Sequence, residues 1–243
     1  MRAGPAICAL GCYMPHLCSW VRSACLMRPK AYYPIFADLN GRRCVVIGGG
    51  LVAQRKVTTL LGYGADIVLV SPEATGRLKR YAKQDRIAYR ARRFRPSDLR
   101  GAWLVYAATD DHRINELVYR SAARQRVFAN VVDQTPLCSF IAPSIFRRGP
   151  LTLAVSTGGG SPSLAKRLRR ELGRTIGADY VPMLQLLRAL RGVARRRLPR
   201  YHDRKRYFDR LVSGRVFQLV SAGKRREARQ QALALLDEAG LKN

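Results

Sequence analysis

A glycine-rich turn is the part of the sequence that points most directly to chemistry. Residues 48–53 read Gly-Gly-Gly-Leu-Val-Ala and fit the pattern G-x-G-x-x-[G/A], between an apolar run and a segment with helical spacing. In this pattern Gly48 permits the tight turn, Gly50 lets backbone approach a pyrophosphate, and Ala53 lets helix and strand pack closely. The pyrophosphate would lie at the positive N-terminus of the helix. The sequence therefore predicts a dinucleotide site.

An acidic residue follows at the distance that such a site needs. Glu73 lies 23 residues beyond Gly50, after a second apolar run. A carboxylate there accepts hydrogen bonds from the adenosine ribose and disfavours a 2′-phosphate, so NAD is expected rather than NADP. The alternative is a purely structural strand-to-helix turn with an exposed Glu at a helix start.

Asp133 is the second candidate for chemistry, because it ends an apolar run where parallel sheets bind ligands. A carboxylate at that place could take a proton while a hydride leaves. The alternative is an Asx turn ahead of residues 134–136. Asp110 and Asp111, after the preceding strand, have the same ambiguity, and helix capping by one of them is favoured.

Two further kinds of segment could meet an anion. The loop at residues 156–161 offers backbone amides and a helix N-terminus, but it is equally a flexible connection. The basic runs at 166–170 and 195–197 are most often solvated helix faces, with a polycarboxylate pocket as the sharper alternative. Nucleic acid is not the expected partner, since no RNA-binding or helix-turn-helix signature is present.

Length and charge limit the class of protein. The 243 residues are 47% hydrophobic, enough for one sizeable core and a smaller appendage. The formal net charge is +29, and residues 166–243 hold 21 basic and 7 acidic residues, which calls for an anionic partner. No apolar run reaches about 18 residues, so a membrane-spanning helix is not predicted.

The six cysteines match no CxxC pair and no familiar zinc pattern, so we expect no metal site and reduced thiols in the cytoplasm. Four of them lie in residues 1–30, where they could still bind a metal or oxidise. That segment shows neither helical nor strand periodicity, and we expect a poorly ordered extension.

Apolar runs alternate with helical spacing over residues 31–141. Strands are predicted at 43–47, 66–70, 87–93, 103–108 and 127–132, and helices at 51–61, 77–83 and 111–124. Such alternation implies right-handed crossovers and a parallel sheet covered on both faces. The expected fold is α/β, a Rossmann-like doubly wound domain.

Beyond residue 141 the pattern changes. A sixth strand is predicted at 151–155, followed by a basic helix that Ser161 caps and Gly173 ends. Residues 178–243 have helical periodicity with breaks at Pro199 and Gly214, which indicates a small helical domain.

Several blocks together resemble the precorrin-2 dehydrogenase family, which includes the N-terminal portion of siroheme synthases. They span about 130 residues in the family's order. The blocks are Tyr-Pro-Ile-Phe (33–36), Val-Ile-Gly-Gly-Gly-Leu-Val-Ala-Gln-Arg-Lys (46–56), Ala-Ala-Thr-Asp-Asp (107–111), Asn-Val-Val-Asp (130–133), Ser-Phe-Ile-Ala-Pro-Ser (139–144) and Val-Ser-Thr-Gly-Gly-Gly-Ser-Pro (155–162).

The resemblance implies NAD-dependent oxidation of precorrin-2, a polycarboxylate tetrapyrrole, to sirohydrochlorin, with iron insertion to siroheme in some members. It carries the family's NAD contacts onto Leu51, Val52, Pro72 and Glu73, and its catalytic aspartate onto Asp133. It also implies a homodimer formed through residues 142–177, with the last helices closing the tetrapyrrole cleft.

Two departures from the family pattern bear on these expectations. Thr157 stands where many siroheme synthases have serine, which puts any role of that hydroxyl in doubt. The chain ends at Asn243, so we do not expect the methyltransferase activity of fused siroheme synthases.

Two other classes of function remain open at this stage. One is a non-catalytic NAD or tetrapyrrole sensor, and the other is a nucleic-acid-binding protein that uses the basic C-terminal third. Neither needs Asp133. Histidines are few, namely His16, His112 and His202, so metal insertion would rest on Asp133 or on no side chain.

Overall fold

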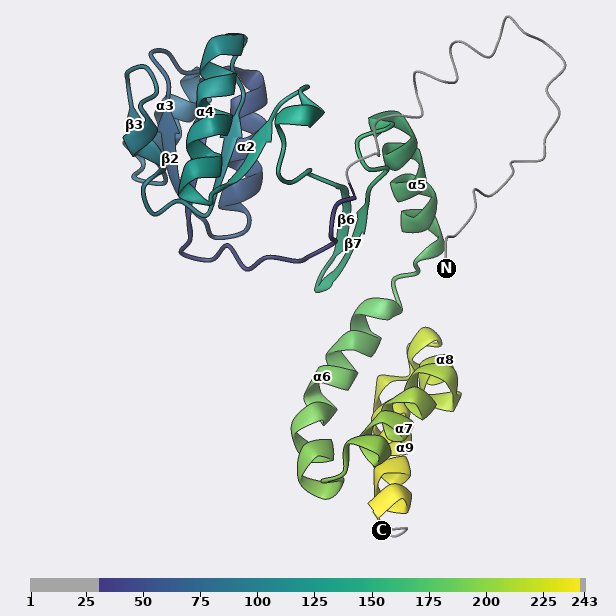
Figure 1. Ribbon diagram of the computed structural model, residues 1–243. Helices are drawn as coiled ribbons and strands as arrows, with labels where there is room; N and C mark the ends of the chain where they lie inside the picture. Colours follow the sequence, from purple (N-terminus) through teal and green to yellow (C-terminus); the bar gives the residue numbers. More distant parts are fainter. Residues whose placement is uncertain (1–30, 241–243) are drawn as a thin grey trace, which may run out of the picture. The chain divides into compact units, whose positions relative to one another are not determined.

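The computed structural model describes residues 31–240 (Figure 1). The extension expected at residues 1–30, with its four cysteines, lies outside this range. Residues 31–37 contain no helix or strand, and they group apart from the rest of the chain. From residue 38 the described chain contains a parallel sheet with helices, then a β-hairpin with a helix, and then a set of four helices.

The five predicted strands of the first part form one parallel sheet in the order β3-β2-β1-β4-β5. In register, Val45 stands between Val68 of one neighbour and Val105 of the other. This order confirms the doubly wound fold, because the order of the strands reverses between β1 and β4. The strands are β1 (Arg43–Ile47), β2 (Asp66–Val70), β3 (Ala88–Arg90), β4 (Leu104–Ala107) and β5 (Phe128–Val131).

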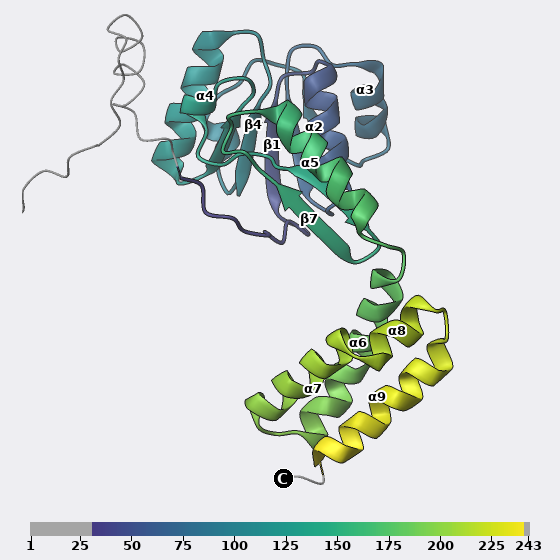
Figure 2. The same cartoon turned by 90° about the vertical axis from the view of Figure 1, so that its right-hand side faces the viewer.

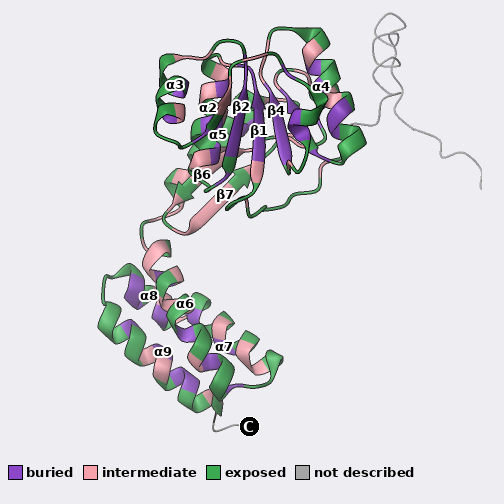
Figure 3. Cartoon of the chain, turned by 90° about the vertical axis from the view of Figure 1, so that its left-hand side faces the viewer, coloured by how far each residue is buried: buried purple, intermediate pink, exposed green. Residues whose placement is uncertain are grey.

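Both faces of the sheet are buried because alternate side chains enter two separate cores. One core packs against α4, through residues such as Val118 and Ala122. The other packs against α2 and α3, through residues such as Val57 and Leu78 (Figure 2). Figure 3 shows the central strands as the most continuously buried part of this domain. The helices are α2 (Leu51–Leu61), α3 (Gly76–Lys83) and α4 (His112–Gln125).

The third strand is shorter than the predicted 87–93, and arginine side chains at its end and just beyond it bind a buried carboxylate. Asp98 lies in the short helix η1 (Pro96–Leu99) and is fully buried. Burial opposes its ionisation, but hydrogen bonds from Arg92, from the Arg95 amide and from Arg90 outweigh this effect and lower the pKa to about 2. This carboxylate holds the β3–β4 connection against the sheet.

The second part contains a strand that the sequence analysis missed. β6 (Ser144–Arg148) pairs antiparallel with the predicted β7 (Leu151–Val155), and Gly149, with a φ of +55°, makes the turn between them. The helix α5 (Pro162–Thr175) follows, and Ser161 caps it by accepting from the Leu164 amide, as predicted.

The prediction that Gly173 ends this helix is wrong, because α5 continues through it. A Cβ at this position would lie 2.8 Å from the Phe146 ring, so the glycine serves close packing on β6. Tertiary contact, which the sequence pattern does not show, explains this residue.

The third part is a helical domain with its own core, to which Leu190, Tyr207 and Leu236 contribute (Figure 2). The predicted breaks at Pro199 and Gly214 are confirmed, and a further break lies at residues 222–224, where Gly223 has a φ of +76°. The helices are α6 (Tyr180–Arg197), α7 (Tyr201–Ser213), α8 (Arg215–Ser221) and α9 (Arg225–Gly240). Between residues 31 and 240, no helix combines the length and apolarity needed to cross a membrane.

Candidate active site

The sequence-predicted site residues gather at the carboxyl edge of the parallel sheet. The glycine turn follows β1, Pro72 and Glu73 follow β2, and Asp133 follows β5. Ligands of open α/β sheets bind along this edge, beside the point where the strand order reverses. Three segments far apart in the sequence therefore lie along one edge of the sheet.

The glycine turn leaves no room for side chains at its first two positions. Gly48 has a φ of +107°, and a Cβ there would lie 2.2 Å from the Ala108 carbonyl oxygen. A Cβ at Gly49 would lie 1.8 Å from the Glu73 carbonyl oxygen. A Cβ at Gly50 would meet nothing within 4 Å. The third glycine thus faces open space, where a ligand can approach the backbone.

Gly49 has a function that the pattern G-x-G-x-x-[G/A] does not show, because the pattern treats it as variable. Its carbonyl accepts a hydrogen bond of 2.9 Å from the Thr75 amide. Its Cα lies so close to the Glu73 carbonyl oxygen that a Cβ would overlap this atom. The Thr75 hydroxyl in turn donates to Gln54 Oε1 at 2.7 Å. The glycine turn and the loop that carries Glu73 are therefore one hydrogen-bonded unit.

The N-terminus of α2 is open to an anion. Gly50 is its N-cap and supplies no side-chain hydrogen bond, and the first turn holds no acidic residue. Leu51 is 71% exposed, whereas Ala53 is completely buried against the sheet, as the motif requires. Helix amides and the helix dipole thus remain available to a pyrophosphate.

Glu73 and Pro72 are both exposed in the bend after β2. Thr75 begins the next helix by accepting from the Leu78 amide, so the carboxylate of Glu73 is not used as a cap. The Glu73 side chain is therefore free to meet a ribose from the position that the sequence predicts.

Asp133 stands at the tip of a strained turn. Its φ of +59° is unusual for a residue with a side chain. The turn is closed behind it by the Gln134 amide, which donates to the Val131 carbonyl, and by the buried Cys138 thiol, which donates to the same carbonyl at 3.2 Å. Backbone strain of this kind is retained where surrounding contacts dictate it, so the exposed carboxylate is presented at the sheet edge.

The alternative role for Asp133, an Asx turn, is not formed. Within residues 31–240, no hydrogen bond joins its carboxylate to the Thr135 amide. Asp111 does take the structural role that was favoured for its pair, since it caps α4 by accepting from the Arg113 and Ile114 amides. The two carboxylates thus differ in use, because Asp111 caps a helix whereas Asp133 is not used in local capping.

Two residues near Asp133 were not assigned a role from the sequence. His112, the first residue of α4, hydrogen-bonds through Nδ1 to Gln134 Nε2 at 2.8 Å. Lys56 lies on α2, where its side chain is half-buried and lies over the Tyr106 ring. The sequence contained one signal of this burial, namely the spacing of three residues from the buried Ala53, because positions i and i+3 share a helix face.

The loop at residues 156–161 uses its hydroxyls internally. Thr157 Oγ1 donates to the Ser161 carbonyl and accepts from the Ser161 amide, both at 3.0 Å. The Ser156 hydroxyl accepts from the Gly158 amide. Threonine therefore stabilises the turn before α5, and anion binding by this loop stays a prediction.

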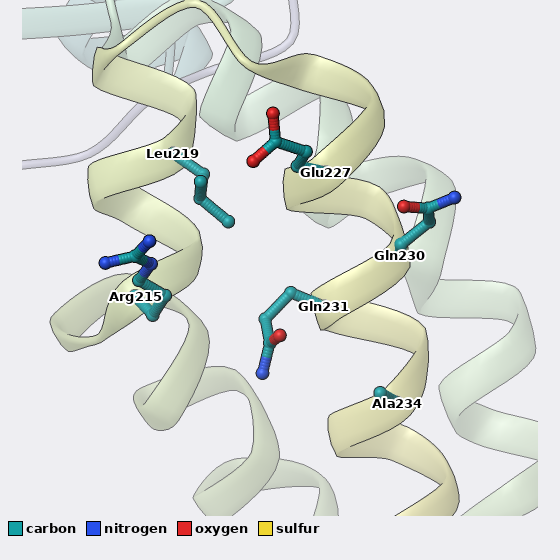
Figure 4. Close-up of a pocket in the computed structure, with 6 residues that line it drawn as sticks. All are labelled: Arg215, Leu219, Glu227, Gln230, Gln231 and Ala234. Carbon is teal, nitrogen blue, oxygen red and sulfur yellow. The ribbon is translucent and has the colours of Figure 1, made fainter.

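The helical domain has a shallow groove of its own, about 370 Å³ in volume, between α8 and α9 (Figure 4). The side chains that line it are mostly polar and none belongs to the sheet domain. They are Arg215, Leu219, Glu227, Gln230, Gln231 and Ala234. No group of three potential metal ligands occurs among the described residues 31–240.

Comparison with known proteins connects this site to a family. Three consecutive family models match the chain: one described as NAD(P)-binding over residues 35–144, the sirohaem biosynthesis protein central region over 148–175, and the sirohaem synthase dimerisation region over 179–236. The chain belongs to the siroheme synthase N-terminal family. Its sheet domain is therefore a nicotinamide-dinucleotide-binding domain.

Relatives with known names agree with this assignment. Siroheme synthase 1 of Serratia proteamaculans is 41% identical over 200 residues, which cover 82% of this chain and 42% of that protein. The siroheme synthase of Nitrosomonas eutropha is 39% identical over 212 residues, covering 86% and 44%. The chain thus spans less than half the length of these two relatives.

A solved structure shows the same fold over its full length. SirC, a precorrin-2 dehydrogenase, aligns with a TM-score of 0.68 and 26% identity, covering 84% of this chain and 100% of that one. The region described as the dimerisation region, 179–236, lies after the segment 142–177 to which the sequence analysis assigned dimerisation. The place of the dimer contact stays a prediction.

The glycine turn generates a matched test. Gly50→Ala should fold with an unchanged melting temperature, because its Cβ meets open space, yet weaken dinucleotide binding about tenfold or more by obstructing the pyrophosphate. Gly49→Ala should lower the melting temperature, because its Cβ would overlap the Glu73 carbonyl. Calorimetry for stability and fluorescence titration for binding would check both. Equal binding by Gly50→Ala and wild type would contradict the assignment.

Proposed function

We propose that this protein catalyses the NAD-dependent oxidation of precorrin-2 to sirohydrochlorin. The observation that carries the proposal is that an open glycine turn and the strained, exposed Asp133 both lie at the carboxyl edge of one sheet. The names of the relatives support it, and so does the full-length alignment with SirC precorrin-2 dehydrogenase.

The oxidation removes two hydrogen atoms from the substrate, one as a hydride and one as a proton. NAD held at the glycine turn would supply the acceptor for the hydride. The Asp133 carboxylate accepts the proton and becomes a neutral acid, which returns the proton to solvent because the side chain is exposed. Neither a sensor nor a nucleic-acid-binding protein needs this carboxylate. Iron insertion, which the resemblance implies for some members, stays a separate prediction.

The fit of the residues to NAD follows from the chain itself. Gly48 and Gly49, which have no space for a side chain, allow the loop of Glu73 to approach the turn. Gly50 faces open space and leaves the helix amides accessible. A carboxylate at the end of β2 would accept from the ribose hydroxyls and repel a 2′-phosphate. We therefore propose NAD as the cofactor rather than NADP.

We also propose that the protein acts as a homodimer. Leu164, Leu168 and Leu172 of α5 recur every four residues and are 48%, 37% and 44% exposed. They form one apolar stripe on a helix that is otherwise strongly basic, and the adjoining hairpin strands are only half-buried. Exposed apolar surface of this kind marks an interface. The family model of a dimerisation region supports the same oligomeric state.

The cytoplasm is the location that we propose. Cys44, in the described part of the chain, is a fully buried free thiol. Burial, with a further contribution from Asp66, raises the pKa of the Cys44 thiol to about 11, so this thiol is unreactive. Unpaired buried thiols are usual in a reducing compartment.

The oxidation is tested by following NADH formation with precorrin-2 and NAD. Wild type should turn over, and Asp133→Asn should lose about 100-fold or more in kcat, because the amide cannot accept the proton. Asp110→Asn removes a neighbouring exposed carboxylate and should leave kcat nearly unchanged. Absence of turnover by a folded, NAD-binding wild type would contradict the proposal, and a non-catalytic NAD or tetrapyrrole sensor would become the leading interpretation.

The cofactor choice is tested by exchanging the acid of the ribose site. Wild type should bind NAD more tightly than NADP, and Glu73→Ser should narrow that preference about tenfold by removing the repulsion of the 2′-phosphate. Dissociation constants for both cofactors, with Asp66→Ser as a control away from the carboxyl edge, would show it. A wild type that prefers NADP would overturn the assignment.

The dimer is tested by placing a charge in the apolar stripe. Leu168→Glu should shift the protein from dimer to monomer in sedimentation equilibrium, because a carboxylate would be buried without a partner. Arg167→Glu changes the charge of the neighbouring, more exposed position and should leave the dimer intact if the stripe is the contact. An unchanged dimer in Leu168→Glu would place the contact elsewhere.

A further inference from the structure

Lys56 occupies an unusual place for a lysine near a sheet edge. It lies on the same face of α2 as Ala53, which is completely buried, and its side chain is half-buried. The ammonium nitrogen is 4.6 Å from the centroid of the Tyr106 ring. Tyr106 is only 8% exposed, and Phe140 packs edge-on against it at 5.3 Å between centroids. The ammonium therefore makes a cation–π contact with a well-packed ring.

The charges around Lys56 belong to the Asp133 turn and to its own helix. Burial lowers the pKa of the ammonium, and repulsion from Arg55 lowers it further, whereas Asp133 and Cys138 act in the opposite direction. The attraction to Asp133 acts through space rather than through a hydrogen bond. Two of the three groups that act on this cation thus come from the turn that presents the candidate catalytic carboxylate.

A packing role alone does not account for this arrangement. The stem of a methionine could cover the Tyr106 ring equally well, without the cost of burying a charge. Other cations of the chain also lie on aromatic rings, such as Arg42 on Trp103, but that pair is not at the carboxyl edge. Lys56 differs because its half-buried ammonium lies over the Tyr106 ring, against which Phe140, from the segment just after the Asp133 turn, also packs.

We propose that Lys56 is a positioning residue for Asp133, whose carboxylate it draws toward the α2 side of the sheet edge, where the glycine turn lies. The strained backbone of Asp133 determines where the side chain starts, and the ammonium determines which way it points. Lys56 itself exchanges no proton with the substrate. The inference rests on the proposed oxidation, because it assigns Lys56 a role only in the proton transfer to Asp133.

The test compares Lys56→Met and Lys56→Arg with wild type in the precorrin-2 and NAD assay. Lys56→Met keeps the apolar stem over Tyr106 but removes the charge, so kcat should fall up to about 100-fold from misorientation of the carboxylate. The dissociation constant for NAD and the melting temperature should stay close to wild type. Lys56→Arg keeps the charge and should recover most of the lost kcat.

The pH profile separates positioning from packing. In wild type, kcat should decline at alkaline pH as the ammonium loses its proton, at a lower pH than an ordinary lysine would because its pKa is lowered. In Lys56→Arg this decline should move to higher pH, because a guanidinium keeps its charge there. Arg55→Met is the matched control: it removes an exposed cation from the same helix and should keep kcat within about twofold.

The outcomes distinguish this inference from the function on which it rests. Turnover by wild type, with Lys56→Met equal to it in kcat and pH profile, overturns the positioning role and leaves the oxidation standing. An Arg55→Met variant as impaired as Lys56→Met also overturns it, since any cation of the helix would then serve. Absence of turnover in folded wild type overturns both the oxidation and the role of Lys56.

Discussion

The site depends on the close approach of the backbone at the end of β1. The chain passes so near to the Ala108 and Glu73 carbonyl oxygens that neither Gly48 nor Gly49 can carry a side chain. The hydrogen bonds from Gly48 to Val70 and from Thr75 to Gly49 join the ends of β1 and β2 into one surface. Because this turn also starts α2, it determines where the helix amides, Glu73 and Lys56 lie relative to the sheet.

The turn at Asp133, after β5, is the second constraint, and it determines how a carboxylate projects from the sheet edge. A carboxylate that takes a proton from a ligand must project from the backbone without being used up in local hydrogen bonds. The Cys138 thiol and the Gln134 amide both bind the Val131 carbonyl, and this closure holds Asp133 at a positive φ. The cost of that conformation, about 1 to 3 kcal/mol for such strain, is carried by the contacts of the buried residues around it.

Much of this arrangement was open to prediction from the sequence. Apolar runs indicated four of the five parallel strands, because strands buried on both faces are apolar throughout. The glycine motif placed the start of α2, and the serine at residue 161 and the aspartate at residue 111 were recognisable as helix caps. These features depend on interactions within a few residues, which the order of residue types records directly.

What only the tertiary structure decided concerns residues whose partners lie far away in the chain. Gly173 was taken for a helix end, but Phe146, a residue of another element, requires the glycine within the helix. Lys56 lies in a helix that the sequence predicted, but only the fold shows that its side chain is half-buried over the ring of Tyr106, a residue of β4. The sequence by itself determined the strands, the dinucleotide turn and the candidate acid. The folded chain decided how the acid is held and which cation faces it, because packing and electrostatic attraction depend on distance in space, and no local pattern encodes that distance.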